Sequence, residues 1–557
     1  MNESMLKNRL FSKSLCVIAA LSLCACSADI PPSGPTGHNG VVSSANPDAS
    51  AIGISVLEAG GSAVDAAVAV SFALGLLEPH ASGLGGCGYA LYAPSDGEAI
   101  FYDYRSMAPM ATDAAAFMQL SDEERKNSIL GAGVPGAVAG WLSLYEDYGT
   151  LPLADLLQPT IDLSENGFTI TDTLAGNMSE QFLKLSADEA CGSLFLHDGL
   201  PYSSGDLLQN PGYAKTLRLI AQQGRDGFYT GEVAEAVLKA SAQKSGWFAE
   251  EDFSGYEVLR TTPIVSTYRG YTILSSAPSS SGGVGIAECL NVLERYDLSS
   301  MGQSTPESLH LIAEALKLAH SDRYQYVGDP KFVPVPVNTL ISKEYAAQRA
   351  AQINENSATD IALPGRIPKE SPSTTHFSIV DKWGNMISVT NTLGTFFGCG
   401  TGVDGYGFIL DNQMYDFSVD SWEANFAQPG KRPRSSMSPT VIYAPDGTPF
   451  AALGTPGGEA IVSTMVQLII NLIDYRMPLQ QAIDAPRIHQ NYEGHMYVEG
   501  GFAPETLAEL EALGHVLTKR NANDSFFGGV HAALRNDDGS WTGGADPRRD
   551  GKALAIR

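Results

Sequence analysis

Residues 373–392 are Ser373-Thr374-Thr375-His376-Phe377-Ser378-Ile379-Val380-Asp381-Lys382-Trp383-Gly384-Asn385-Met386-Ile387-Ser388-Val389-Thr390-Asn391-Thr392. β-Branched, aromatic and hydroxyl residues alternate on both sides of a short central segment, a pattern typical of two strands joined by a tight turn. In the middle, Lys382-Trp383-Gly384 supplies a glycine where a three-residue hairpin loop needs a positive φ angle. This stretch therefore predicts a β-hairpin with a threonine at each end.

The register of this hairpin follows from its loop. If residues 382–384 form the turn, Val380 pairs with Met386, and Thr374 lies opposite Thr392 on the same face. Directly opposed residues have Cβ atoms about 4.5–5.5 Å apart, whereas a slip of one residue would place the two hydroxyls on opposite faces. On this stretch alone, the two threonines are either an ordinary cross-strand pair or the centre of an active site.

The composition of the 557-residue chain is that of a globular protein, with 44% hydrophobic and 17% charged residues. Its 35 basic and 62 acidic residues give a formal net charge of −27, so nucleic acids and anionic membrane surfaces are poor partners for most of its surface. The chain contains no GxxxxGK[ST], HExxH or GxSxG motif, which argues against the common phosphate-loop, zinc-protease and α/β-hydrolase sites.

The first 40 residues have the features of an export signal followed by a tether. Lys7, Arg9 and Lys13 precede an apolar run, Leu15–Leu23, that is too short to span a bilayer. Leu23-Cys24-Ala25-Cys26 is similar to a bacterial lipobox, which would make residues 1–25 a signal peptide, Cys26 the lipidated N-terminus and residues 26–40 a lipidated tether. We expect a lipoprotein anchored to the cell envelope, in the periplasm or at the cell surface, or a secreted protein if the lipobox is not used.

Four cysteines follow the tether: Cys87, Cys191, Cys289 and Cys399. They allow two disulfides, in any of three pairings, or none. They lie far apart in the sequence and form no Cys-x-x-Cys motif, which argues against a zinc–cysteine site or a redox centre. The sequence therefore shows no requirement for a metal or an organic cofactor.

Helical and strand-like segments alternate along the rest of the chain. Residues 46–76 predict two alanine-rich helices separated by Gly60-Gly61, with Ser62 as the cap of the second. Thr305 and Pro306 predict the start of another helix, on which His320 is a core or boundary residue. Further strands are expected at 88–92, 100–104, 440–443 and 450–453, and a further helix at 461–475.

Two polar features of the chain remain open at this level. Arg105 follows a predicted strand and precedes a turn, so it is either a structural ion-pair partner or an anion ligand. Residues 355–373 are polar and contain prolines, which predicts an exposed loop that leads directly into the hairpin. Backbone cleavage could occur in such a loop, and its ends could then separate.

Several motifs together resemble the γ-glutamyltranspeptidase family of N-terminal-nucleophile hydrolases. They are Thr374-Thr375-His376-Phe377-Ser378, then Arg432-Pro433 with Ser435-Ser436-Met437-Ser438-Pro439, and then Pro456-Gly457-Gly458. The resemblance runs from about Gly40 to the C-terminus and includes the glycine- and arginine-rich stretch at 543–551. Each motif alone is weak, but their order and spacing are specific.

The resemblance implies an α+β fold, an αββα sandwich in which helices flank two stacked antiparallel sheets. It also implies a precursor that cleaves itself between Ser373 and Thr374 into a large subunit, residues 41–373, and a small catalytic subunit, residues 374–557. Cleavage would free an α-amino group with a pKa of about 7.7–8, which can act as a base for the hydroxyl of the same residue. This explains why a threonine should become N-terminal.

The catalytic roles are also implied by the resemblance. Thr374 would attack the γ-glutamyl amide of a glutathione-like donor, and Thr392 would position it. Backbone N–H groups of Gly457 and Gly458 would form the oxyanion hole. The resulting acyl-enzyme would pass the acyl group to water or to an amino acid or peptide acceptor.

Five further residues match those that hold the donor in this family. Arg105, Ser435 and Ser436 would bind its α-carboxylate, and Gln413 and Asp416 its α-ammonium. The expected partners are therefore this small-molecule substrate, the acceptor and the two subunits of one precursor, with the membrane contacted through the lipid only.

The chain departs from the family pattern at three positions near these residues. Gly394 replaces the usual asparagine that helps to bind the donor's amino group, Ser106 replaces a glutamate after Arg105, and Tyr415 replaces the first of two acidic residues. An amide acylase of glutaryl type on the same fold is therefore one alternative. A catalytically inert ligand-binding lipoprotein is another.

Overall fold

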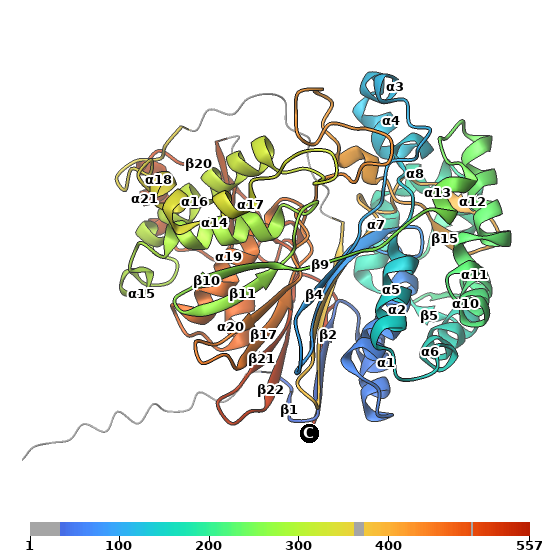
Figure 1. The fold of residues 1–557 in the computed structure, drawn as a ribbon, viewed down its shortest axis with the longest axis horizontal. Helices are drawn as coiled ribbons and strands as arrows, with labels where there is room; N and C mark the ends of the chain where they lie inside the picture. The colour runs from blue at the N-terminus through green and yellow to red at the C-terminus, as the bar shows by residue number, and fades with distance from the viewer. Residues whose placement is uncertain (1–33, 361–372, 492–493) are drawn as a thin grey trace, which may run out of the picture. The chain divides into compact units, whose positions relative to one another are not determined.

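The computed structural model describes residues 34–360, 373–491 and 494–557. At its centre are two seven-stranded sheets in which all neighbouring strands are antiparallel (Figure 1). The first sheet has the order β1 (Thr36–Gly37), β22 (Trp541–Ala545), β21 (His531–Arg535), β17 (Pro449–Gly454), β16 (Thr440–Tyr443), β11 (Tyr271–Ser275) and β10 (Ile264–Tyr268). The second has the order β23 (Lys552–Ile556), β2 (Gly40–Ser44), β12 (Thr375–Asp381), β13 (Met386–Thr392), β3 (Cys87–Ala93), β4 (Ile100–Tyr104) and β9 (Leu259–Thr261).

Helices cover the outer face of each sheet (Figure 1). Outside the second sheet lie α1 (Pro47–Glu58), α2 (Ala63–Leu77), α5 (Ala137–Tyr148), α6 (Leu153–Asn166), α10 (Pro211–Gln223), α11 (Asp226–Tyr229) and α12 (Gly231–Gln243). Outside the first lie α14 (Gly282–Leu293), α16 (Pro306–Tyr326), α18 (Lys343–Ala350), α19 (Ala460–Ile473) and α20 (Leu479–Asp484). A small sheet of β18 (Ile488–Gln490), β19 (His495–Val498) and β20 (Val516–Lys519) adjoins α21 (Pro504–Ala512) and α16.

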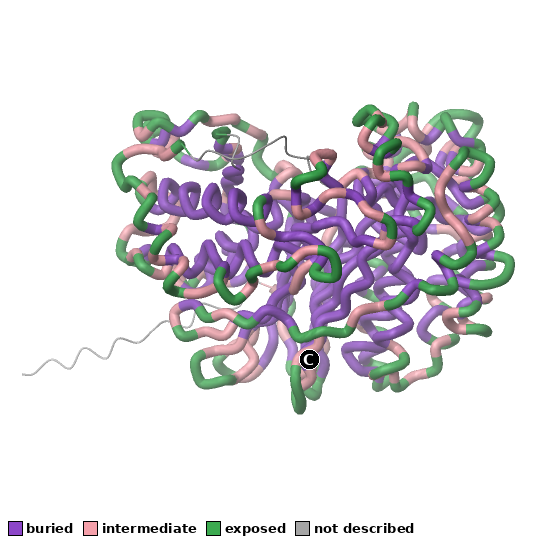
Figure 2. Tube along the Cα trace, turned by 45° about the horizontal axis from the view of Figure 1, so that its top comes forward, coloured by how far each residue is buried: buried purple, intermediate pink, exposed green. Residues whose placement is uncertain are grey.

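The two sheets stack face to face through hydroxyls and apolar side chains. Ser378 Oγ donates to the carbonyl of His531 and Ser388 Oγ to that of Leu453, each at 3.0 Å. One hydrophobic cluster joins the two sheets and the helices outside the first, and another joins the second sheet to its own helices. Because both faces of β12 and β13 are covered, all of their residues are buried, as the purple centre of Figure 2 shows. The predicted αββα sandwich is confirmed.

The hairpin predicted at residues 373–392 is β12 and β13, with the predicted register. Val380 pairs with Met386 and Thr375 with Asn391, and Gly384 has a φ angle of 84°. The Asp381 carboxylate accepts hydrogen bonds from the backbone N–H groups of Trp383 (2.9 Å) and Asn385 (3.0 Å), which closes the loop. The local turn chemistry therefore agrees with the register that the fold adopts.

The predicted helix caps are also present. Ser62 and Asp65 form a reciprocal capping box at the start of α2, and the Thr305 side chain accepts from the backbone N–H of Ser308 at the start of α16. His320 lies buried on α16, as expected of a core residue. The other predicted strands and the helix at 461–475 are found within two residues of their expected bounds.

Several sequence predictions concern residues that are not described. The signal peptide and the lipidated Cys26 fall within residues 1–33, and most of the predicted exposed loop falls within 361–372. Thr36–Gly37 is strand β1 and pairs with β22, so the described fold begins within the stretch assigned to the tether. No described helix is both long and apolar enough to cross a membrane.

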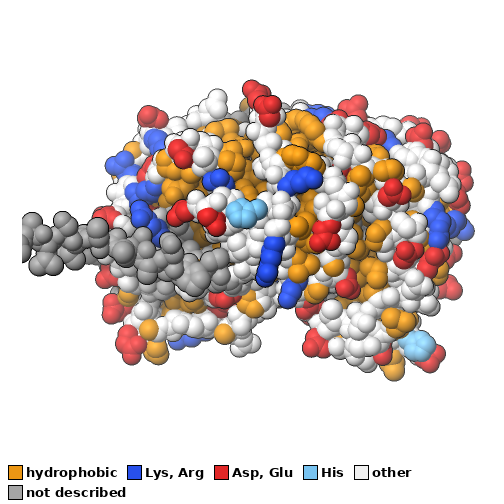
Figure 3. Space-filling view, turned by 90° about the horizontal axis from the view of Figure 1, so that it is seen from below, with side chains coloured by type: hydrophobic (Ala, Val, Ile, Leu, Met, Phe, Trp, Pro, Cys, Tyr) orange, Lys and Arg blue, Asp and Glu red, His pale blue; other side chains and the backbone are white. Residues whose placement is uncertain are grey.

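The four cysteines beyond the tether are all buried and free, so none of the three disulfide pairings forms. On the face shown in Figure 3, acidic, basic and apolar side chains are interspersed. That face therefore has no continuous basic area that would suit a polyanion, in agreement with the net charge of −27.

Candidate active site

Thr374 and Thr392 face each other at the open end of the hairpin. Their Oγ1 atoms are 3.2 Å apart, and both are buried. In this uncleaved chain, the Thr374 hydroxyl hydrogen-bonds the carbonyl oxygen of its own preceding residue, Ser373. Thr392 Oγ1 donates to the same carbonyl oxygen (2.9 Å) and accepts from the backbone N–H of Gly394 (2.9 Å). The predicted nucleophile, the carbonyl at the predicted cleavage bond and a hydrogen-bond donor to that carbonyl are therefore in contact.

A small pocket adjoins the two threonines. All the predicted catalytic and donor-binding residues except Gly457 line it. Its volume is about 20 Å³, which is enough for a single water molecule, and Ser373 is part of its wall. Because Ser373 forms part of this wall, release of the Ser373 end by cleavage would enlarge the space available to a donor.

Arg105 and Asp416 form a buried ion pair in this pocket. Arg105 lies directly after β4, and its side chain is 1% exposed. Its Nε donates to the carbonyl of Pro433 and its Nη2 to that of Arg434, each at 3.2 Å, while Nη2 also contacts the Asp416 carboxylate. The predicted carboxylate ligand and the predicted ammonium ligand thus neutralise each other in the unliganded chain. A zwitterionic donor inserted between them would replace one ion pair by two.

A loop of three serines, Ser279–Ser281, supports Ser435. The carbonyl of Ser435 accepts from the backbone N–H (2.7 Å) and the Oγ (2.8 Å) of Ser281. Ser279 Oγ in turn lies 2.8 Å from the Tyr89 hydroxyl on β3. The loop therefore ties the serine pair to the second sheet, a role that no local sequence signal would reveal.

Gln413 lies beside the ion pair with its amide free. The residue is 1% exposed, and neither its Oε1 nor its Nε2 has a hydrogen-bond partner among the described residues. A buried amide without partners costs free energy, so such groups in a pocket are expected to bind a ligand. The Gln413 amide is therefore poised to bind a polar group of the substrate.

The space that a side chain at position 394 would occupy is taken by another residue, Asn412. Gly394 has a φ angle of 91°, and a Cβ atom there would lie 2.1 Å from Asn412 Oδ1. The Asn412 amide is itself saturated by protein: it accepts from the N–H of Thr395 (2.8 Å) and donates to Thr395 Oγ1 (2.7 Å) and to the carbonyl of Lys126 (2.8 Å). The asparagine usual at position 394 would not fit here, and Asn412 does not present its amide in its place.

Ser106, another departure from the family pattern, is explained by a buried carboxyl group. Its hydroxyl donates to Asp411, which also accepts from the backbone N–H groups of Gly133 (2.8 Å) and Gln413 (3.1 Å). Burial raises the pKa of Asp411 to about 7, against these hydrogen bonds, which lower it. Asp411 thus links the Arg105 side of the pocket to Gln413, and its place in the site was not predicted.

Gly457 and Gly458 lie between β17 and α19 with φ angles of 132° and 56°. L-residues rarely adopt this region, so glycine is needed at both positions for backbone reasons. Gly458 lines the pocket, whereas the nearest neighbour of a Cβ at Gly457 would be Gly528 Cα at 3.2 Å.

Glu78 is a second buried carboxyl group close to the nucleophile. The hydroxyl of Thr375, the residue after Thr374, donates to it. Burial raises the pKa of Glu78 to about 7, although the Thr375 hydrogen bond and the Arg549 charge lower it. The only sequence signal was its position in Glu78-Pro79, before the glycine-rich turn.

We expect Glu78 to make the folded state less stable as the pH rises. Between pH 4.5 and 7 the unfolded carboxyl loses its proton while the folded one keeps it, so unfolding becomes easier by up to about 3 kcal/mol. Glu78→Gln should remove this loss. Urea unfolding from pH 4.5 to 7, with Thr374→Ala in both proteins to keep the chain intact, measures it. Parallel curves for the two proteins would contradict the assignment.

The chain is similar to known proteins along nearly its whole length. The γ-glutamyltranspeptidase family model matches residues 49–556. The chain is 37% identical to the glutathione hydrolase proenzyme of Escherichia coli (strain K12), covering 97% of this chain and 98% of that protein. It is 38% identical to the acylase ACY 1 proenzyme of Pseudomonas sp. (strain V22), covering 94% of each. Among solved structures, cephalosporin acylase from Bacillus halodurans superposes with a TM-score of 0.88 at 29% identity, covering 94% of this chain and 96% of that one.

Proposed function

The chain belongs to the γ-glutamyltranspeptidase family, and on that premise we infer that it is a γ-glutamyl hydrolase and transferase made as a self-cleaving precursor. Its substrate is a small molecule, a γ-glutamyl compound such as glutathione. The observation that carries this function is the pocket in which Thr374 and Thr392 lie beside the Arg105–Asp416 ion pair and the free amide of Gln413.

Self-cleavage begins with attack of Thr374 Oγ1 on the carbonyl carbon of Ser373. The hydrogen bond from Thr392 to the Ser373 oxygen supports this proposal, because it stabilises the negative charge that develops there. The C–N bond to Thr374 then breaks, the proton of the hydroxyl goes to the leaving nitrogen, and an ester to Thr374 Oγ1 remains. This break already frees the α-amino group of Thr374. Water then hydrolyses the ester, which restores the Thr374 hydroxyl and releases the carboxylate of Ser373.

In the mature enzyme, the freed α-amino group serves as the base for the Thr374 hydroxyl. Its pKa of about 7.7–8 suits proton transfer near neutral pH. Thr374 Oγ1 attacks the γ-carbonyl of the donor, and the N–H groups of Gly457 and Gly458 receive the oxyanion. The amine leaves with the proton, and water or an amino acid or peptide acceptor then takes the γ-glutamyl group from the threonyl ester.

The α-amino acid end of the donor binds between Arg105 and Asp416. Its carboxylate pairs with Arg105 and hydrogen-bonds Ser435 and Ser436, and its ammonium pairs with Asp416 and the Gln413 amide oxygen. The buried but unpartnered Gln413 amide supports this assignment. Because Asn412 occupies the space beside Gly394, the ammonium has fewer amide ligands than is usual in the family.

Matched γ-glutamyl and glutaryl anilides test this recognition, because they differ only in the α-amino group. Hydrogen bonds to charged groups contribute about 1.5–3 kcal/mol, so we expect kcat/KM to favour the γ-glutamyl anilide by roughly 10- to 100-fold. Gln413→Leu should lower that preference through a higher KM for the γ-glutamyl anilide and leave the glutaryl anilide as the internal control.

An acylase of glutaryl type is the second candidate, and Gly394 with its saturated neighbour Asn412 is the observation that favours it. Equal or better turnover of the glutaryl anilide would establish this alternative and refute γ-glutamyl recognition.

We also propose that the protein is exported and carries a lipid on Cys26, as the lipobox-like stretch at 23–26 suggests. Intact-mass measurement of the large subunit tests this. A lipidated Cys26 supports envelope anchoring, and an unmodified N-terminus elsewhere rules it out.

A further inference from the structure

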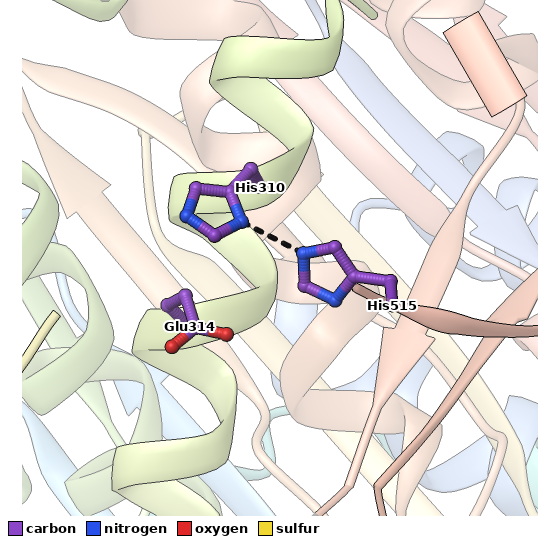
Figure 4. Close-up of side chains that lie close together, drawn as sticks. All are labelled: His310, Glu314 and His515. Atoms are coloured by element: carbon purple, nitrogen blue, oxygen red, sulfur yellow. Dashed lines mark hydrogen bonds between the residues drawn. The ribbon is translucent and has the colours of Figure 1, made fainter. Parts of the chain in front are cut away.

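Three potential metal ligands converge away from the candidate active site (Figure 4). His310 and Glu314 lie one turn apart on α16, and His515 comes directly before β20. All three residues are buried, and their ligand atoms lie within 4.8 Å of one another. Buried carboxylate and imidazole groups from two separate elements are the kind of set that binds transition metals.

We propose that His310 Nδ1, His515 Nε2 and a Glu314 carboxylate oxygen bind one zinc ion. The two nitrogens are now 2.7 Å apart and share a hydrogen bond. Zinc–nitrogen bonds are about 2.0–2.1 Å, so two imidazoles in a tetrahedral site have nitrogens roughly 3.4 Å apart. The two nitrogens therefore need to move apart by only roughly 0.7 Å for both to bind the zinc ion in place of their shared hydrogen bond.

The surroundings of His310 orient it for this role. Its Nε2 lies 2.9 Å from the carbonyl oxygen of Asn354, so Nε2–H donates and the lone pair of Nδ1 faces His515. Metal-binding histidines usually have such an outer hydrogen bond, which determines their tautomer. His515 Nε2–H therefore donates to His310 Nδ1, and His515 must give up this Nε2 proton to become a ligand. On zinc binding its proton moves to Nδ1.

The Lys317 ammonium competes with a metal ion for the Glu314 carboxylate. Its Nζ lies 2.5 Å from Glu314 Oε1 and 2.9 Å from the carbonyl oxygen of Thr359, while Glu314 Oε2 accepts from the Thr359 N–H (3.2 Å). Zinc bound through Oε1 would displace the Lys317 ammonium from that oxygen, and Lys317 could keep its bond to Thr359. Because a cation so close disfavours a second one, removal of the Lys317 charge should strengthen zinc binding.

The position of the site suggests a structural purpose. His310 and Glu314 precede the Ser373–Thr374 bond in the sequence and His515 follows it, so the metal would join two polypeptides after cleavage. That consequence rests on the proposed self-cleavage, whereas metal binding by the folded chain does not.

Zinc binding to the full-length chain tests the proposal, with wild type and the uncleaved Thr374→Ala protein measured in parallel. A chelator first removes bound metal, and zinc is then added and its excess dialysed away. Elemental analysis gives the stoichiometry, and competition with a chromophoric chelator gives the affinity. We expect one zinc per chain, an affinity at least about 100-fold weaker in His515→Asn, and an affinity roughly 10-fold stronger in Lys317→Met. His489→Asn, in a second buried histidine pair with His320, should bind zinc like wild type.

Cobalt(II) provides a spectroscopic signature that a metal-free pair of hydrogen-bonded histidines would not produce. It should give the visible spectrum of a tetrahedral nitrogen–oxygen site in wild type and lose it in His515→Asn. If zinc is not retained, or if neither His515→Asn nor Lys317→Met changes its affinity, the proposal is wrong. Should His515→Asn fail to fold, Lys317→Met still decides. A wild-type protein that binds no zinc but turns over the anilides normally would reject this site and leave the proposed function standing.

Discussion

Thr374→Ala is expected to give a single uncut polypeptide with no measurable turnover of a γ-glutamyl anilide, a loss of at least about 10⁴-fold in kcat. The physical reason is that one hydroxyl carries both reactions. Thr374 Oγ1 contacts the Ser373 carbonyl that it must attack during maturation, and it is also the group that would receive the acyl chain. A denaturing gel and an anilide assay measure the two losses on the same sample.

Thr374→Ser is the matched control, because it keeps the hydroxyl and removes only a methyl group. We expect it to cleave and to turn over the donor, more slowly than wild type. N-terminal sequencing of the smaller wild-type band should begin at Thr374-Thr375-His376-Phe377. An uncut and inactive wild type would instead favour the inert ligand-binding protein, and an active Thr374→Ala protein would place the nucleophile elsewhere.

Arg105→Gln is expected to lower kcat/KM for γ-glutamyl donors by roughly 10³-fold, mainly through KM. Removal of one partner of a buried ion pair costs about 3–5 kcal/mol, and here the donor's carboxylate and Asp416 both lose their cation. Arg105→Lys keeps the charge but not the planar fork, so it should lose only about 10- to 100-fold. Steady-state kinetics with one anilide rank the three proteins.

Self-cleavage shows whether the Arg105→Gln protein is folded, so that a loss of donor binding can be distinguished from misfolding. No described hydrogen bond joins Arg105 to Ser373 or Thr374, so a folded Arg105→Gln protein should still cut itself. Arg487 makes a matched control, since it pairs with Asp546 in another buried ion pair that does not line the pocket. Arg487→Gln should lower the stability and leave KM unchanged. Equal KM values in wild type and Arg105→Gln would refute the carboxylate role.

Local patterns were sufficient wherever nearby residues determine the geometry. The β12–β13 register follows from a three-residue loop closed by Asp381, and α2 begins where Ser62 and Asp65 cap each other. Hydrogen bonds of this kind join residues two to four positions apart, so the residue order alone specifies them. The motif resemblance then extended these predictions to the fold class and to the residues around the pocket.

Contacts between distant segments could not be predicted in this way. Asn412 fills the space beside Gly394, the loop at 279–281 supports Ser435, and Asp411 joins Ser106 to Gln413. In each case the partners meet only because separate strands and loops pack into one fold. The free state of all four buried cysteines is also a result of packing, which the residue count left open.

The sequence by itself determined the hairpin, the opposition of Thr374 and Thr392, and the family, because turn chemistry and motif order are properties of the chain. Only the tertiary structure decided that Arg105 meets Asp416, that the Gln413 amide has no partner among the described residues, and that Ser373 forms part of the pocket wall. The physical reason is that burial, pairing and free volume depend on which remote groups share a space. Those quantities exist only once the two sheets have stacked.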